Sequence, residues 1–255
     1  MGDVSGIDVF YKARSAAQKA LQLDSHIPES HIALALLDYI YFWNFREAEY
    51  ELREALALEP NSAYAHVTFC WFYADVGKTD DMLDECRRAA EIDQFSPIYN
   101  MSLTLAYNFS HDYGRALQQA KKALDMEPTN PNAIIWLGDT YGLVENYKEA
   151  MEQWAKVAKL NGDDEYAKEI MKTFETSGYR AFLKRDAEYH EAQQNYNYAA
   201  GDYAMLGDKD AAFADLNKAF SNRAGVLFIK VDPDFDNLRS DPRFADLLQR
   251  IGLPQ

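Results

Sequence analysis

The chain has 255 residues, and 41 Asp and Glu against 26 Lys and Arg give it a formal net charge of −15. This balance argues against nucleic acid and anionic lipid as partners, because both require clustered cations, and it favours a protein partner. Hydrophobic residues make up 48% of the chain and aromatic residues 14%, which is enough for a packed core and excludes a disordered chain.

The longest apolar stretch, residues 32–43, contains Asp38 and is shorter than the roughly 20 apolar residues of a membrane-spanning helix. The first residues show neither the basic start nor the apolar run of a signal peptide. We therefore expect no membrane insertion and a cytoplasmic location. Cys70 and Cys86 are too few for a disulfide framework and have no CxxC spacing, so we predict reduced, buried thiols.

At the N-terminal end, residues 7–27 have the pattern of a single helix. Their ending, Ala-Leu-Gln-Leu-Asp, is similar to the Ala-Leu-Ala-Leu-Glu at residues 55–59. We interpret the segment as the second helix of a half repeat, and we expect that an upstream region is missing.

From residue 28 the sequence repeats with a step of 34 residues. Two sets of residues keep this step: Tyr73, Tyr107 and Tyr141, and Ala55, Ala89 and Ala123. Each period contains two apolar patterns with the i, i+3, i+4 spacing of an amphipathic helix, separated by a short polar turn. The sequence therefore predicts an all-α chain built from helical hairpins.

A two-helix unit of this length resembles the tetratricopeptide repeat. The clearest copy reads Ile134, Leu137, Gly138, Tyr141, Ala150 and Trp154. The resemblance covers nearly the whole chain as one solenoid, with repeats at 28–62, 63–96, 97–130, 131–164 and 193–224. The position that holds Trp in the family never holds Trp here. The resemblance implies a right-handed superhelix of stacked hairpins with an extended concave face.

Two segments depart from the repeat. Residues 165–192 are predicted to form an irregular helical hairpin that turns at Ser177 and Gly178. Residues 225–255 are predicted to form a C-terminal cap, with a short apolar run at 226–229 and a last helix. This ending is similar to that of bacterial regulators in which tetratricopeptide arrays follow a winged-helix, Ser/Thr kinase or adenylate cyclase domain, and it implies a regulatory module joined to an effector.

In the tetratricopeptide family the concave face is lined by positions two, five, nine and twelve of each first helix. The resemblance places sixteen residues there: Glu29, Ile32, Leu36, Tyr39, Tyr64, Val67, Trp71, Ala74, Ile98, Met101, Leu105, Asn108, Asn132, Ile135, Asp139 and Gly142. Most are apolar or aromatic, which favours binding of an apolar or amphipathic protein segment. Alternatively, the superhelix or the cap buries these side chains, and the chain is a structural or oligomerisation module. The scarcity of cations argues against a clamp for a peptide's terminal carboxylate.

The C-terminal aspartates suggest a possible calcium loop. Asp232, Asp234 and Asp236 have the spacing that opens such a loop, but Arg243 stands where the final glutamate ligand is required. We favour the alternative that Asp232 and Asp241, each followed by Pro, cap short helices.

The histidines show no HExxH motif and no short metal spacing, and His31 and His66 share one position of the repeat, so packing explains them better. Nucleophile motifs and phosphate-binding loops are absent from the sequence. We predict no metal, no cofactor and no catalytic residues, and a scaffold that binds a protein segment within a larger bacterial signalling or transcription regulator. A homo-oligomer and a small-molecule or metal sensor remain alternatives.

Overall fold

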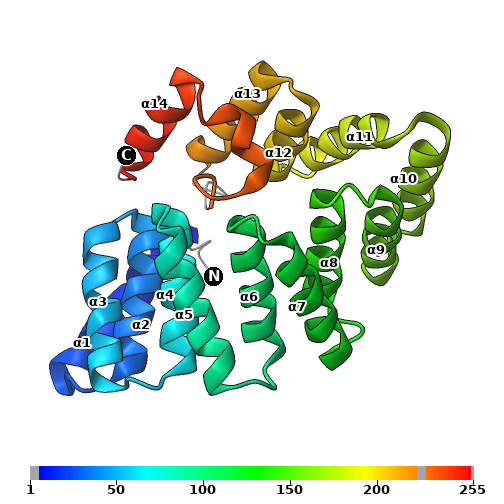
Figure 1. Ribbon diagram of the computed structural model, residues 1–255. Coiled ribbons are helices and arrows are strands. Elements are labelled where there is room, and N and C mark those ends of the chain that lie inside the picture. Colours follow the sequence, from blue (N-terminus) through cyan, green and yellow to red (C-terminus); the bar gives the residue numbers. More distant parts are fainter. Residues whose placement is uncertain (1–5, 223–227, 254–255) are drawn as a thin grey trace.

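The computed structural model describes residues 6–222 and 228–253, and every regular element in these ranges is a helix. Helices pair as antiparallel hairpins, and successive hairpins stack side by side in a curved array (Figure 1). The predicted all-α solenoid of paired helices is confirmed. In the described part of the chain, no helix is long and apolar enough to cross a membrane.

The helices follow the sequence pattern closely. Their bounds are α1 Gly6–Leu23, α2 Pro28–Leu37, the π-helical turn η1 Asp38–Phe42, α3 Phe45–Leu58, α4 Ala63–Val76, α5 Thr79–Ile92, α6 Pro97–Phe109, α7 Tyr113–Met126, α8 Pro131–Leu143, α9 Tyr147–Leu160, α10 Asp164–Ser177, α11 Tyr179–Ala192, α12 Tyr196–Leu206, α13 Lys209–Ser221, the 3-10 helix η2 Pro233–Leu238 and α14 Pro242–Ile251. The segment 28–62 is one residue longer than 63–96, and η1 accommodates the extra residue, because a π turn holds one more residue than an α turn.

The turns inside the α4–α5, α6–α7 and α8–α9 hairpins repeat their backbone geometry with the same step of 34 residues. Gly77, His111 and Glu145 all lie in the left-handed region, with φ of 79°, 58° and 59°. In each turn the N–H of the next residue donates to the carbonyl oxygen of the periodic tyrosine at 2.9 Å. This bond closes the first helix in a Schellman motif and reverses the chain into the second helix.

The left-handed geometry at Glu145 predicts a stabilising substitution. Glu145 is exposed, and glycine adopts its positive φ without a Cβ clash, so Glu145→Gly should raise the free energy of unfolding by about 0.5–1 kcal/mol. Urea unfolding measures the change. Glu145→Gln removes the same charge but keeps the Cβ, and it should change stability by less than about 0.5 kcal/mol. Equal effects of the two variants would contradict this explanation.

Histidines replace the family's Trp in the first two repeats and tie the preceding turn to the second helix. The Nδ1 atom of His66 lies 2.5 Å from Oε2 of Glu85, and its Nε2 atom lies 3.1 Å from the carbonyl oxygen of Pro60. His31 makes the equivalent contact with Glu51 at 2.6 Å. The packing explanation for these two buried histidines is confirmed.

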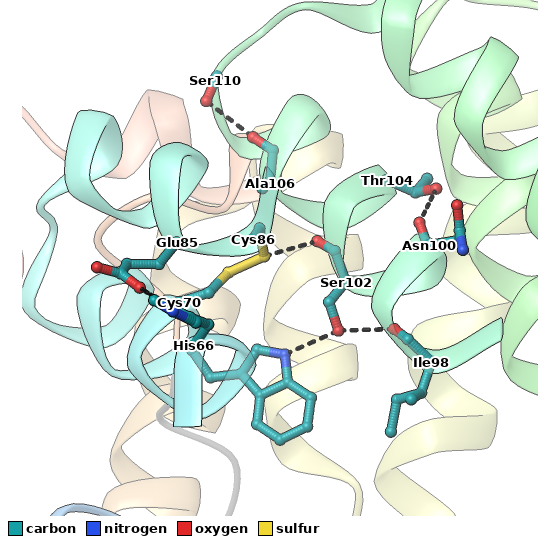
Figure 2. The surroundings of a disulfide bond; sticks show 11 residues. His66, Cys70, Glu85, Cys86, Ile98, Asn100, Ser102, Thr104, Ala106 and Ser110 are labelled. Atoms are coloured by element: carbon teal, nitrogen blue, oxygen red, sulfur yellow. Dashed lines mark hydrogen bonds and ion pairs between the residues drawn. A yellow bond between two sulfur atoms is a disulfide. The ribbon is translucent and has the colours of Figure 1, made fainter. Parts of the chain in front are cut away.

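Cys70 and Cys86 form a disulfide, which corrects the prediction of reduced thiols. The two residues occupy facing positions of α4 and α5, with their Cα atoms 5.2 Å apart, within the normal range for a disulfide. Figure 2 shows the bond inside the hairpin, with Sγ of Cys86 3.2 Å from the carbonyl oxygen of Ser102 on α6. In the α8–α9 hairpin, Gly138 and Trp154 occupy the same two positions, and a Cβ on Gly138 would lie 2.8 Å from the Trp154 ring.

The disulfide should contribute measurably to stability. It closes a short chain segment, with a sequence separation of 16, and removing it with Cys70→Ala/Cys86→Ala should lower the free energy of unfolding by about 3 kcal/mol. Reduced parent protein should show a similar loss in the same urea titration. Two free thiols in denatured, unreduced protein would contradict the bond.

The C-terminal third curves back over the first hairpins, so that α14 lies above α3 and α4 in Figure 1. The largest buried cluster joins side chains of α2–α6 with side chains of α12, α13, η2 and α14. Trp43 packs on Phe220 at a ring-centroid distance of 5.4 Å, and Phe109 packs on Phe228 at 5.7 Å. The chain is therefore closed by contacts between its two ends.

The two irregular segments fold as helices. The hairpin α10–α11 turns at Gly178, where φ is 81°, as the sequence predicted, and packs on α9 through a second buried cluster that includes Met151, Ile170 and Phe182. In the cap, Ile229 is fully buried, whereas residues 226 and 227 of the predicted apolar run lie outside the described residues.

Candidate functional site

The sixteen predicted contact residues differ sharply in exposure. Those at position two of each first helix lie at the exposed N-terminal ends of α2, α4, α6 and α8, and we call them the rim row: Glu29, Tyr64, Ile98 and Asn132. Tyr64 is 45% exposed and Ile98 44% exposed. The rim row is the part of the predicted set that a partner can reach most directly.

The deeper positions are largely occupied by contacts within the chain. Six of them are buried: Ile32, Tyr39, Val67, Ala74, Met101 and Asn108. Six are partly buried: Leu36, Trp71, Leu105, Ile135, Asp139 and Gly142. The Trp71 indole N–H donates to Oγ of Ser102 at 3.2 Å, and the Asn108 amide donates to Oγ1 of Thr140 at 2.9 Å. Both bonds join neighbouring first helices, so these side chains hold the repeats together.

The chain's own C-terminal segment contacts the ends of α4 and α6. The backbone N–H of Phe228 donates to Oδ1 of Asp75 at 2.8 Å, and Nζ of Lys230 donates to the carbonyl oxygen of Val76 at 3.1 Å. A Cβ on Gly77 would lie 2.8 Å from the Lys230 side chain, so the glycine also makes room for this segment. Residues 228–231 therefore occupy the space beside the C-terminal ends of α4 and α6.

Asp75 is buried in this contact. Burial raises its pKa from 3.8 to about 8, although the hydrogen bond from Phe228 acts in the opposite direction. Its other carboxyl oxygen has no hydrogen-bond partner in the described part of the chain. Asp75 is therefore protonated in the folded protein at pH 7.

The raised pKa of Asp75 predicts a pH-dependent loss of stability. Between about pH 4 and 8 the folded chain holds a proton that the unfolded chain releases, so the free energy of unfolding falls by about 1.4 kcal/mol per pH unit as pH rises. Asp75→Asn keeps an oxygen acceptor for Phe228 and removes the charge. Its stability advantage over the parent should be small at pH 5 and large at pH 8.5, as measured by urea unfolding. The exposed Asp80→Asn serves as the control, and an advantage that does not change with pH would contradict the assignment.

A second group of polar side chains lies on α8, α11, α12 and the cap. Asp139 accepts a hydrogen bond from the Trp154 indole at 2.9 Å, and burial raises its pKa to about 7. Asp186 and His190 project from α11 toward Asp202 on α12, and ligand atoms of these three residues lie within 4.8 Å of one another. This group was not predicted from the sequence, because histidines and aspartates were each compared only with their own kind. The signal was the Asp186–His190 spacing of four, which places both side chains on one helix face.

The C-terminal aspartates act as helix caps. Asp232 accepts the backbone N–H of Asp234 at the start of η2, and Asp241 accepts that of Arg243 at the start of α14. The capping prediction for Asp232 and Asp241 is confirmed. Asp236 instead lies beside His111, with Oδ2 3.7 Å from Nε2 of the imidazole.

Comparisons with known proteins agree with the fold. The family model "Tetratricopeptide repeat" matches residues 110–172. Among curated proteins, the chain is similar to the HTH-type transcriptional regulator YidZ of Salmonella newport and Salmonella heidelberg, with 28% identity over 106 residues. The matched part covers 41% of this chain and 33% of the relative, so the chain spans about a third of the length of these regulators.

Solved structures share the architecture at low sequence identity. PilW, described as a widely conserved type IV pilus biogenesis factor, aligns over 91% of both chains with a TM-score of 0.58 and 17% identity. YrrB, described as a TPR protein with an unusual peptide-binding site, aligns over 66% of this chain and 87% of its own, with a TM-score of 0.50 and 20% identity. The paired helices and the repeated turn geometry give the chain the tetratricopeptide-type architecture of these structures, and the family model matches residues 110–172 within it.

Proposed function

We propose that this chain is a non-catalytic scaffold that binds a segment of another protein along the rim row. The observation that carries the proposal is the division of the first-helix residues by exposure. The deeper positions are largely buried in repeat packing, while Tyr64 and Ile98 present nearly half of their surface to solvent. Exposed aromatic and large aliphatic side chains are typical anchors of protein interfaces.

The neighbourhood of the rim row extends this surface. Phe95, in the turn before α6, is 87% exposed and precedes Ile98 by three residues. The acidic chain, with its formal charge of −15, favours a partner segment that combines apolar anchors with Lys or Arg. A terminal carboxylate is a poor match, because the rim row itself carries Glu29 and no cation.

The comparisons support the proposal in two ways. The tetratricopeptide fold is widely used for protein binding, and the description of YrrB names a peptide-binding site in a structure of the same architecture. The partial similarity to YidZ supports a place in a larger bacterial signalling or transcription regulator. The disulfide supports an oxidising compartment, so it weighs against the predicted cytoplasmic location and favours a signalling protein over a transcription regulator.

A second candidate function is a structural or oligomerisation module. The contacts of Phe228 with Asp75 and of Lys230 with Val76 favour it, because the chain's own C-terminal segment fills space that a ligand would otherwise enter. In this case the rim row would contact a second copy of the chain.

A photo-crosslinking amino acid placed at Tyr64, and separately at Ile98, tests the scaffold role in the native host. Both positions should capture the same protein, and the same probe at Gln118, an exposed residue of the second helix α7, should not. Tyr64→Glu/Ile98→Glu should reduce the capture at least about tenfold, the effect of losing one or two interface anchors, while the melting temperature changes little. Equal capture from Gln118 would contradict the proposal. Self-crosslinks alone, with concentration-dependent dimers in light scattering, would support the second candidate.

A further inference from the structure

The group formed by Asp186, His190 and Asp202 is built from two adjacent helices. Asp186 and His190 are four residues apart on α11, so their side chains share one face of the helix. Asp202 comes from α12, which packs directly against α11. One carboxylate oxygen from each aspartate and one imidazole nitrogen lie within 4.8 Å of one another.

Two of these side chains have ligand atoms without a partner. Asp202 is only 6% exposed, and its Oδ2 atom is fully buried. No described residue donates a hydrogen bond to this atom. The same holds for Nδ1 of His190, while its Nε2 atom is 3.8 Å from Oδ2 of Asp186, too far for a hydrogen bond. A buried polar atom without a hydrogen-bond partner is costly, so two such atoms on the side chains of one group indicate a missing ligand.

The surroundings of Asp202 favour a cation. Apart from burial itself, the groups that act on its carboxyl are Asp186, Asp234 and Asp139, and all three are acidic. Asp234 also lies close, because a Cβ on Gly201 would be 3.4 Å from its Oδ2 atom. A positive ion bound here would relieve this repulsion in a region of low dielectric.

Aromatic neighbours hold the group in place. The Tyr166 hydroxyl donates to Oδ1 of Asp186, which leaves Oδ2 directed toward His190. The His190 ring stacks on Tyr198 at a centroid distance of 5.2 Å, and the edge of the ring contacts Tyr189. Fixing the orientation of a ligand by a hydrogen bond to its second atom is a common feature of metal sites.

We propose that Asp186, His190 and Asp202 bind one divalent transition-metal ion, with Zn²⁺ as the best match. A set of one imidazole and two carboxylates suits Zn²⁺ and disfavours Ca²⁺ and Mg²⁺, which take oxygen ligands almost exclusively. Three protein ligands leave a further coordination position open. Two ligand atoms of one Zn²⁺ ion lie at most about 4.2 Å apart, which is twice the length of a bond from Zn²⁺ to nitrogen or oxygen. The three side chains must therefore move slightly closer together when the ion binds.

Titration of the full chain with Zn²⁺ against a chromophoric chelator tests the proposal. We expect one ion per chain, a rise in melting temperature with Zn²⁺ and not with Ca²⁺, and visible absorption bands when Co²⁺ replaces Zn²⁺. Asp202→Asn and His190→Gln should each weaken binding at least about tenfold. His26→Gln is the matched control, because His26 also lies beside a carboxylate, 3.4 Å from Asp24, but is exposed and has no third ligand.

The stability of the metal-free variants separates a metal ligand from a structural residue. Asp202→Asn removes a buried carboxyl group whose Oδ2 atom has no hydrogen-bond partner among the described residues, so the metal-free variant should melt at or above the parent temperature while losing the rise caused by Zn²⁺. Absence of Zn²⁺ binding in the parent, or unchanged affinity in both variants, would overturn the proposal. The rim row lies on other helices, so a negative result here leaves the proposed scaffold function untouched.

Discussion

The distance between the two helices of each hairpin is the constraint on which the stack depends. It is set at one pair of facing positions, which hold Cys70 and Cys86 in one hairpin and Gly138 and Trp154 in another. The two solutions differ chemically, one a covalent bond and the other a glycine beneath an indole ring. Both keep the backbones close enough for the next hairpin to pack on the same side, and a larger residue at either first position would separate the helices.

Contacts between the ends of the chain divide the inner surface into regions with different roles. Near α4 and α6, Phe228 and Lys230 from the cap satisfy polar groups at the helix ends. Near α11 and α12, buried acidic side chains lie together without sufficient hydrogen-bond donors. The rim row is left for external contacts. A single solenoid thus combines a surface filled by its own chain, a cluster of polar side chains and an exposed apolar edge.

Features that depend on local sequence could be predicted, and those that depend on distant contacts could not. The tyrosine spacing of 34 predicted the hairpins because each repeat places the same residue types at the same local positions, and the Asp-Pro pairs predicted caps because a cap forms between neighbours in the chain. The disulfide escaped prediction because Cys70 and Cys86 come together only through hairpin register. Tyr39 and Val67 are buried by contacts with other helices, and Asp202 joins the acidic group from a different helix. The sequence pattern of a single helix does not predict such contacts.

The hydrogen bond between Phe228 and Asp75 joins residues 153 positions apart. In an open array each unit touches only its neighbours, so folding can start anywhere and the last units fray first. A bond of this sequence separation can form only after the early hairpins have folded, and closing the long loop between the two residues costs entropy that slows folding. Once this bond has formed, the last helices cannot unfold independently of the first ones. We therefore expect the whole array to unfold in one cooperative transition, without earlier loss of its terminal helices.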